Sequence, residues 1–304
     1  MHPRRAGESG VALLLAVWLL ALLAVVAGEF VFSTRVRAAA ERNARDDLRA
    51  RALALAGYRA AVAALDDRIA SVSVDAEGRL LLHYRGAQEG TPAAGKDVPL
   101  GDGTFSWSIA SEDGLVDVNT IGQRTVLANL LGKCGLEPGA DRDTVIDSIL
   151  DWRDTNREHR LNGAEEDYYR GLDPPYSCKD GRLDVIEELL LVRGVTPELF
   201  FGRKERDRTL PGLRDLLSVH SFEFNPGAAP KAVLEALGQT RKTRPSPPGG
   251  RYRIVATGNP GGGAPQRSLQ AVVQRDDAGD SRTFSLLYWN ESVNPDPVVT
   301  EEGN

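Results

Sequence analysis

The sequence lacks the short motifs by which many enzymes are recognised. Its four histidines show no HExxH spacing, and neither a GxSxG nor a GxxxxGK[ST] segment occurs. It also lacks a basic excess, because the net charge is −6 and the pI is near 5.4. A nucleic-acid-binding domain normally carries a basic surface. We therefore expect a protein that is not an enzyme and has no nucleic-acid partner.

Cysteine is equally scarce. Cys134 and Cys178 are the only two, they lie far apart in the sequence, and they do not form a CxxC redox pair. Such an even, sparse count is compatible with one structural disulfide in an oxidising compartment. It is equally compatible with two inert buried thiols. Whether this part of the chain lies in an oxidising compartment therefore decides between a disulfide and two free thiols.

Charged residues are absent from one long stretch near the N-terminus. The segment from Val11 to Gly28 has neither a charge nor a proline, and Arg4 and Arg5 precede it. At about 1.5 Å of rise per residue, this segment nearly spans a hydrocarbon core of roughly 30 Å. The arginines favour a cytoplasmic position for the leader.

Two interpretations of this stretch are open. A secretory signal would be cut behind the apolar run, near Ala24–Gly28. A prepilin would be cut in front of it, after Gly10, which would leave Val11 as the new N-terminus and retain the apolar run as an anchor. The second interpretation is favoured because the chain continues without a proline, rich in Ala, Arg and Leu, to about Ile69. We expect one continuous helix from Val11 to that point.

The remainder alternates between strand-like and helix-like patterns. Strands are expected at 79–85, 104–110, 115–119, 251–257, 268–275 and 282–289, and helices at 124–131, 142–152, 183–193, 197–202 and 211–217. A Pro/Gly/Ser-rich linker at 244–250 separates the helical part from the last strands. The pattern predicts an α+β protein in which a β-rich frame is interrupted by an all-helical insertion.

Oxygen-bearing side chains crowd residues 151–169. An EF-hand-type loop beginning at Asp154 would place ligands at the positions that follow: Asp154, Asn156, Glu158, the carbonyl of Arg160, Asn162 and Glu165. His159 stands where that loop needs glycine. Spacing alone therefore leaves two possibilities open, a Ca²⁺ site and an ordinary solvated acidic helix end.

The N-terminal segments GVALLLAVWLLALLAVVAG and ERNARDDLRARALALAGYRAA resemble protein K of the general (type II) secretion pathway, a minor pseudopilin. This resemblance implies cleavage between Gly10 and Val11 by the prepilin peptidase, followed by methylation of the new amine. It also implies a type IV pilin-like fold, a long N-terminal helix plus an antiparallel sheet, with a large inserted all-helical domain. Most mature pilins have glutamate as their fifth residue, whereas this chain has Leu15 there, as fits a subunit at the tip.

The resemblance divides the chain into five segments. These are a leader (1–10), the transmembrane part of the helix (11–30), the pilin-like helix and first strands (31–120), the inserted helical domain (121–243), and a linker with the C-terminal strands (244–304). It places the protein in the bacterial inner membrane by a single pass, with its bulk in the periplasm. The implied partners are the other minor pseudopilins, proteins I and J of the pathway.

The resemblance extends to the acidic segment. The family has an Asp-Trp-x-Asp…Gly-Ala-Glu pattern, here Asp151, Trp152, Asp154, Gly163, Ala164 and Glu165, and its helical domain binds calcium. The implied Ca²⁺ ligands are Asp151, Asp154, Asn156 and Glu165, with Glu166, Asp167 and the Arg160 carbonyl as weaker candidates. A periplasmic location favours the Cys134–Cys178 disulfide. Two alternatives to the tip role stay open: an anchored calcium-dependent hydrolase or binding module, and a minor pilin of a type IV pilus.

Overall fold

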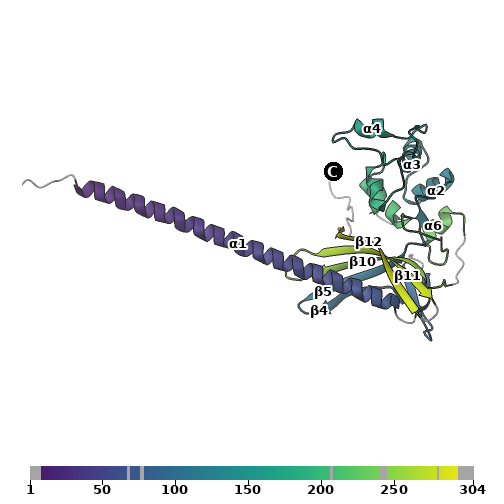
Figure 1. Cartoon of the computed structure of the whole chain (residues 1–304), viewed down its shortest axis with the longest axis horizontal. Coiled ribbons are helices and arrows are strands. Elements are labelled where there is room, and N and C mark those ends of the chain that lie inside the picture. Colours follow the sequence, from purple (N-terminus) through teal and green to yellow (C-terminus); the bar gives the residue numbers. More distant parts are fainter. Residues whose placement is uncertain are drawn as a thin grey trace, which may run out of the picture.

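The chain is dominated by α1 (Glu8–Asp66), a helix of 59 residues that projects far beyond the rest of the molecule (Figure 1). The computed structural model describes residues 8–66, 69–75, 79–205, 208–239, 245–278 and 281–293. The first half of α1 is apolar yet exposed, with Trp18 at 73% and Phe32 at 71% exposure. Within the described residues, α1 is the one helix long and apolar enough to cross a membrane.

The predicted cleavage site lies near the start of this helix. Gly10 and Val11 belong to the helical backbone of α1, and residues 1–7 of the leader lie outside the described residues. Cleavage and methylation stay predictions. At its other end, α1 stops at Asp66, and Ile69 begins strand β1 (Ile69–Val74), so the expectation that the helix reaches Ile69 is wrong.

The second half of α1 packs on a sheet through small residues at helical spacing. Ala50, Ala54, Ala61 and Leu65 are all buried, at most 2% exposed, and their spacings of four, seven and four residues place them on one face of the helix. The approach is very close at Gly258, where an added Cβ would lie 2.1 Å from the carbonyl oxygen of Ala50. Alanine and glycine let the two backbones meet, so the helix lies directly on the sheet.

That sheet has five antiparallel strands in the order β12-β11-β10-β5-β4. Their bounds are β4 Ala94–Leu100, β5 Gly103–Ser111, β10 Gly250–Asn259, β11 Arg267–Ala278 and β12 Ser281–Val293. Strand β10 pairs directly with β5, with Ile254 opposite Ile109, although most of the chain between them is elsewhere. The long helix and the antiparallel sheet confirm the predicted α+β, pilin-like class.

A small sheet continues this frame. Strand β1 pairs with β2 (Leu80–Tyr84), which pairs with β3 (Thr91–Pro92). Ala93 links it to the large sheet, because its N–H donates to the Leu80 carbonyl and its carbonyl accepts from the Ile109 N–H. One hydrophobic core joins the helix and both sheets, with Leu65, Leu82, Ile109, Tyr252 and Ile254 among its buried members.

The segments between β5 and β10 form a helical region to one side of the sheet (Figure 1). In order they are β6 Val116–Asp117, α2 Arg124–Lys133, α3 Ala140–Arg153, α4 Glu166–Arg170, the 3₁₀ helix η1 Ile186–Leu191, α5 Pro197–Phe201, β7 Gly202–Lys204, β8 Thr209–Pro211, the 3₁₀ turn η2 Leu213–Asp215, β9 Leu217–Ser218 and α6 Lys231–Ala236. The helix expected at 211–217 is wrong, since β8 ends at Pro211, η2 takes up 213–215 and β9 begins at Leu217. The region has its own buried core around Leu130, Ile149 and Phe200.

Two consecutive buried acids fix this helical region to the sheet. Asp113 accepts hydrogen bonds from the Phe222 N–H (3.0 Å) and the Arg251 N–H (2.8 Å). Glu112 forms an ion pair with Arg253 of β10 and accepts from the Ser218 hydroxyl. Both acids are under 9% exposed. The insertion is therefore held by buried polar contacts at its root.

Candidate metal centre

The acidic segment forms the facing ends of α3 and α4. Asp151 lies in the last turn of α3 and Asp154 is its C-cap, while Glu165 is the N-cap of α4. Asp151 and Glu165 are buried, at 0% and 2% exposure. Each of these carboxylates needs a positively charged partner or a proton, because an ionised carboxylate is costly to bury without a partner.

Arg160 supplies that partner for two of the predicted ligands. Its Nη1 lies 2.5 Å from Oδ1 of Asp151 and 2.6 Å from Oδ2 of Asp154. The Arg160 carbonyl, a predicted ligand, instead accepts from the Gly163 N–H at 3.1 Å. A Cβ at Gly163 would lie 1.8 Å from Oδ2 of Asp151, so glycine is required there. The guanidinium thus stands where a cation bound to both aspartates would stand.

Glu165 has no such partner. Within the described residues, neither of its carboxylate oxygens has a hydrogen-bond donor, although both are buried. Burial, together with the negative charges of Asp151, Asp180 and Asp154, raises its pKa from 4.5 to about 7. A carboxylate in this position must either hold a proton or bind a cation.

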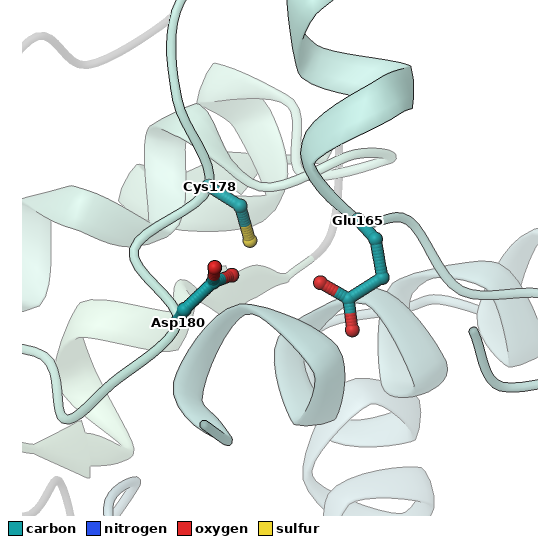
Figure 2. A group of neighbouring side chains, drawn as sticks. All are labelled: Glu165, Cys178 and Asp180. Carbon is teal, nitrogen blue, oxygen red and sulfur yellow. The ribbon is translucent and has the colours of Figure 1, made fainter. Parts of the chain in front are cut away.

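Cys178 and Asp180 complete the surroundings of Glu165 from the loop that follows α4. Figure 2 shows the three side chains directed toward one another, and their ligand atoms all lie within 4.8 Å of each other. Among the described residues, Oδ1 of Asp180 is also buried without a hydrogen-bond partner. The sequence analysis missed Asp180, and it considered Cys178 as a half-cystine or an inert thiol but not as a member of this group. The signal available was the Cys-x-Asp pair at 178–180.

The structure does not bring the other predicted ligands to this place. Asn156 is exposed and bonds the backbone of the same loop, accepting from the Glu158 N–H at 2.7 Å. Glu166 pairs with Arg170 and accepts from the Cys178 N–H, each at 2.7 Å. Asp167 pairs with His159 at 2.9 Å. These three side chains have other contacts, so only part of the predicted set of calcium ligands lies together.

The predicted Cys134–Cys178 disulfide is not present in this structure and stays a prediction. Both cysteines are buried free thiols. The pKa of Cys134 is influenced by Asp215 and Arg203, whereas that of Cys178 is influenced by Asp180 and Glu165, so the two thiols have different charged surroundings. Burial raises the pKa of each thiol to about 12. The second of the two open alternatives, inert buried thiols, describes this state.

The donor set fits a divalent cation. The unpartnered oxygens of Glu165 and Asp180 would hold the ion, and Asp151 and Asp154 would join them if Arg160 moved away. Four carboxylates so close repel one another unless positive charge separates them. Bound there, a cation would tie the end of α3 and the start of α4 to the loop at 178–180.

Comparisons with known proteins match this region and its surroundings. The family model of the type II secretion system (T2SS) protein K matches residues 109–201. The chain is 28% identical to the type II secretion system protein K of Klebsiella pneumoniae over 255 residues, which are 76% of this chain and 70% of the relative. Its fold matches a chain in the crystal structure of the GspK-GspI-GspJ complex from enterotoxigenic Escherichia coli, with a TM-score of 0.54 and 14% identity, covering 86% of this chain and 99% of that one. The resemblance to protein K of the type II secretion system, predicted from the N-terminal segments, is thereby confirmed.

Proposed function

We propose that this protein is a minor pseudopilin that stands at the tip of the type II secretion pseudopilus. There it initiates assembly of the fibre and supports export of folded proteins across the outer membrane. The observation that carries the proposal is α1: one unbroken helix whose first half is apolar and exposed and whose second half packs on the sheet. A helix built in this way both anchors a subunit and presents a surface to the helices of neighbouring subunits.

The tip position is supported by the residue five places after the proposed cleavage site. Leu15 is an exposed apolar residue of α1, and it offers no carboxylate to the terminal ammonium of an adjacent subunit. An ammonium left unpaired in an apolar fibre core is costly. The bulk of the helical insertion likewise fits the end of a fibre better than its middle.

Processing and location follow from the same segment. Prepilin peptidase would cut after Gly10 and methylate Val11, and the apolar half of α1 would remain in the inner membrane by a single pass. Arg4 and Arg5 of the leader favour a cytoplasmic start, which places the sheet and the helical insertion in the periplasm.

The partners that we propose are the other minor pseudopilins, proteins I and J of the pathway. The solved structure with the matching fold is a chain of a GspK-GspI-GspJ complex, which supports this choice. We also propose a structural Ca²⁺ ion, held by Glu165, Asp151, Asp154 and Asp180. Hard oxygen ligands suit calcium, and the buried unpartnered carboxylate of Glu165 supports the assignment.

The test is the intact mass of the protein isolated from membranes of its native host. A mass that lacks residues 1–10 and carries one added methyl supports the pseudopilin role. A mass that begins near Gly28 or Glu29 would show an ordinary secreted protein and would overturn the anchor and the tip role together. Pull-down of proteins I and J by the full chain in detergent then tests the partners separately.

A further inference from the structure

The part of α1 between the apolar run and the sheet is rich in arginine. Four arginines but only two glutamates lie between residues 29 and 45, although the whole chain has a net charge of −6. The arginines are Arg35, Arg37, Arg42 and Arg45, and all four are exposed. Figure 1 shows the first half of α1 lying clear of the folded bulk of the molecule. A basic segment therefore follows directly on the proposed membrane anchor.

The apolar run ends just before these arginines. Counted from the proposed cleavage site at about 1.5 Å of rise per residue, a hydrocarbon core of roughly 30 Å ends near residue 31. Ser33 and Thr34 follow, and each donates its hydroxyl to the carbonyl of Phe30, at 3.0 and 2.7 Å. Hydroxyl groups that bond to their own helix need no water, which suits the edge of a membrane. Arg35 is then the first charged residue beyond that edge.

Arg35 and Arg37 are within reach of the lipid headgroups at that edge. Their Cα atoms lie about 6 and 9 Å beyond residue 31 along the helix axis, and a headgroup layer is about 5–7 Å thick. The side chains of a helix point back toward its N-terminus, which here is toward the membrane. Each guanidinium therefore lies nearer to the headgroups than its own Cα atom does.

The two arginines have no protein partner within the described residues. Further along α1, Arg49 pairs with Asp102 and Arg51 pairs with Glu291, but Arg35 and Arg37 form no such pair with any residue that the structure describes. At 3.6 residues per turn they lie about 200° apart around the helix, and so on opposite sides of it. A single partner helix would contact one side, whereas lipid headgroups surround an anchor. The arrangement therefore favours lipid.

We propose that Arg35 and Arg37 bind the phosphate groups of anionic phospholipids in the periplasmic leaflet and thereby fix the depth of α1 in the membrane. A guanidinium can donate two parallel hydrogen bonds to one phosphate. Arg42 and Arg45 lie further out and add a weaker attraction, because salt screens exposed charges over about 8–10 Å. Basic residues that orient an anchor gather on its cytoplasmic side, so these arginines need a different role. The inference rests on the proposed anchor and adds the class of lipid at its boundary.

The test uses the full chain reconstituted in phosphatidylcholine vesicles. The probes are spin-labelled phosphatidylglycerol and spin-labelled phosphatidylcholine, because lipids that contact a membrane-spanning helix give a motionally restricted component in the electron paramagnetic resonance spectrum. We expect at least a twofold preference for phosphatidylglycerol in the wild type and none in the double variant Arg35→Gln/Arg37→Gln. Raising NaCl to about 1 M should weaken the preference in the wild type, and that measurement needs no variant.

The matched control is Arg59→Gln/Arg85→Gln, which removes the same charge from two exposed arginines outside the anchor. Arg59 lies about 42 Å beyond residue 31 along the axis of α1, far from any headgroup. This control should keep the wild-type preference. An equal loss of preference in the control and in Arg35→Gln/Arg37→Gln would show an effect of net charge alone and would overturn the proposal.

The proposal is also overturned if the wild type shows no preference, if the preference is insensitive to salt, or if it persists in Arg35→Gln/Arg37→Gln. No preference in the wild type, combined with weaker capture of proteins I and J by that variant, would assign the two arginines to a protein interface. A spectrum without any restricted component for either probe would show that α1 does not enter the bilayer. That result alone would overturn the proposed anchor, and this inference with it.

Discussion

Nε of Arg253 lies 2.9 Å from Oε1 of Glu112, and this ion pair is buried where the sheet meets the helical insertion. The side chains are 14% and 4% exposed. The other Glu112 oxygen accepts from Ser218, and Arg253 donates to the Arg214 carbonyl. One buried pair therefore connects β10 with two segments of the insertion.

Replacing Glu112 with alanine should destabilise the protein by about 3 kcal/mol, because it leaves the Arg253 charge buried without its counter-ion. Unfolding of the full chain by urea in detergent, followed by tryptophan fluorescence, measures the change in stability. The control is Asp102→Asn, which breaks the exposed pair between Arg49 and Asp102, whose side chains are 45% and 93% exposed. That control should have no measurable effect, and an equal loss in both variants would contradict the assignment.

Gly258→Val should loosen α1 from the sheet. An added Cβ would lie 2.1 Å from the carbonyl oxygen of Ala50, so the helix must move, at a cost of about 1–3 kcal/mol. Hydrogen exchange of the α1 amides around Ala50 and Ala54 measures this loosening. Gly122→Ala is the control, because a Cβ there meets nothing within 4 Å. Unchanged exchange in Gly258→Val would refute the close approach.

His220 should make stability depend on pH. Burial lowers its pKa from 6.5, and Arg251 and Arg253 lower it further, while Glu112 and Glu187 oppose this. The unfolded chain therefore binds a proton more readily than the folded chain, so the contribution is present above about pH 6.5 and is lost as the pH falls below it. Unfolding midpoints at pH 5.5 and 7.5 should differ less in His220→Gln than in wild type. An equal difference would assign the effect to other groups.

The two thiols should resist alkylation in the folded protein, because burial raises the pKa of each to about 12. Unfolding without reductant should then allow two adducts in the mass spectrum, and one adduct in Cys134→Ser. Unfolded wild type that takes no adduct would show that Cys134 and Cys178 form a disulfide after all. This measurement decides between the two states that the sequence leaves open.

Removal of calcium should lower the stability of the helical insertion. At a calcium concentration one hundred times its Kd, binding stabilises the folded state by about 2.7 kcal/mol. Glu165→Gln should abolish the calcium-induced rise in Tm, because it removes the buried unpartnered carboxylate. Asp167→Asn should retain that rise, since Asp167 is exposed and paired with His159. If both variants keep the rise, Glu165 is not a ligand.

The frame of the molecule was predictable because its signals are local. An apolar run followed by Ala, Arg and Leu specifies α1, and alternation specifies strands such as β10 and β11. The end of α1 was misplaced because Ile69 fits either a helix or a strand, and only pairing with Tyr84 of β2 decides it. Residues 211–217 do not form a helix because their two ends are in strands: β8 pairs with β7, and β9 pairs with the distant β6.

The site was predictable only in part, because its residues come from separate segments. Asp151, Asp154 and Glu165 lie in one acidic run, and their spacing indicates them. Asp180 reaches the same place only after the turn that follows α4, which no periodic pattern marks. The sequence also gives no sign that the Arg160 side chain, rather than its carbonyl, contacts the aspartates. Long-range packing supplies that information.

Because β5 and β10 are neighbours in the sheet, the insertion leaves it and returns to it at adjacent positions. The helical insertion is therefore a replaceable module. It can become larger or smaller, or be exchanged, while the strands of the large sheet keep their positions. In the proposed fibre, α1 would have to match the neighbouring subunits, whereas the insertion has only to begin and end at two adjacent strands. Selection can accordingly act on the two parts at different rates.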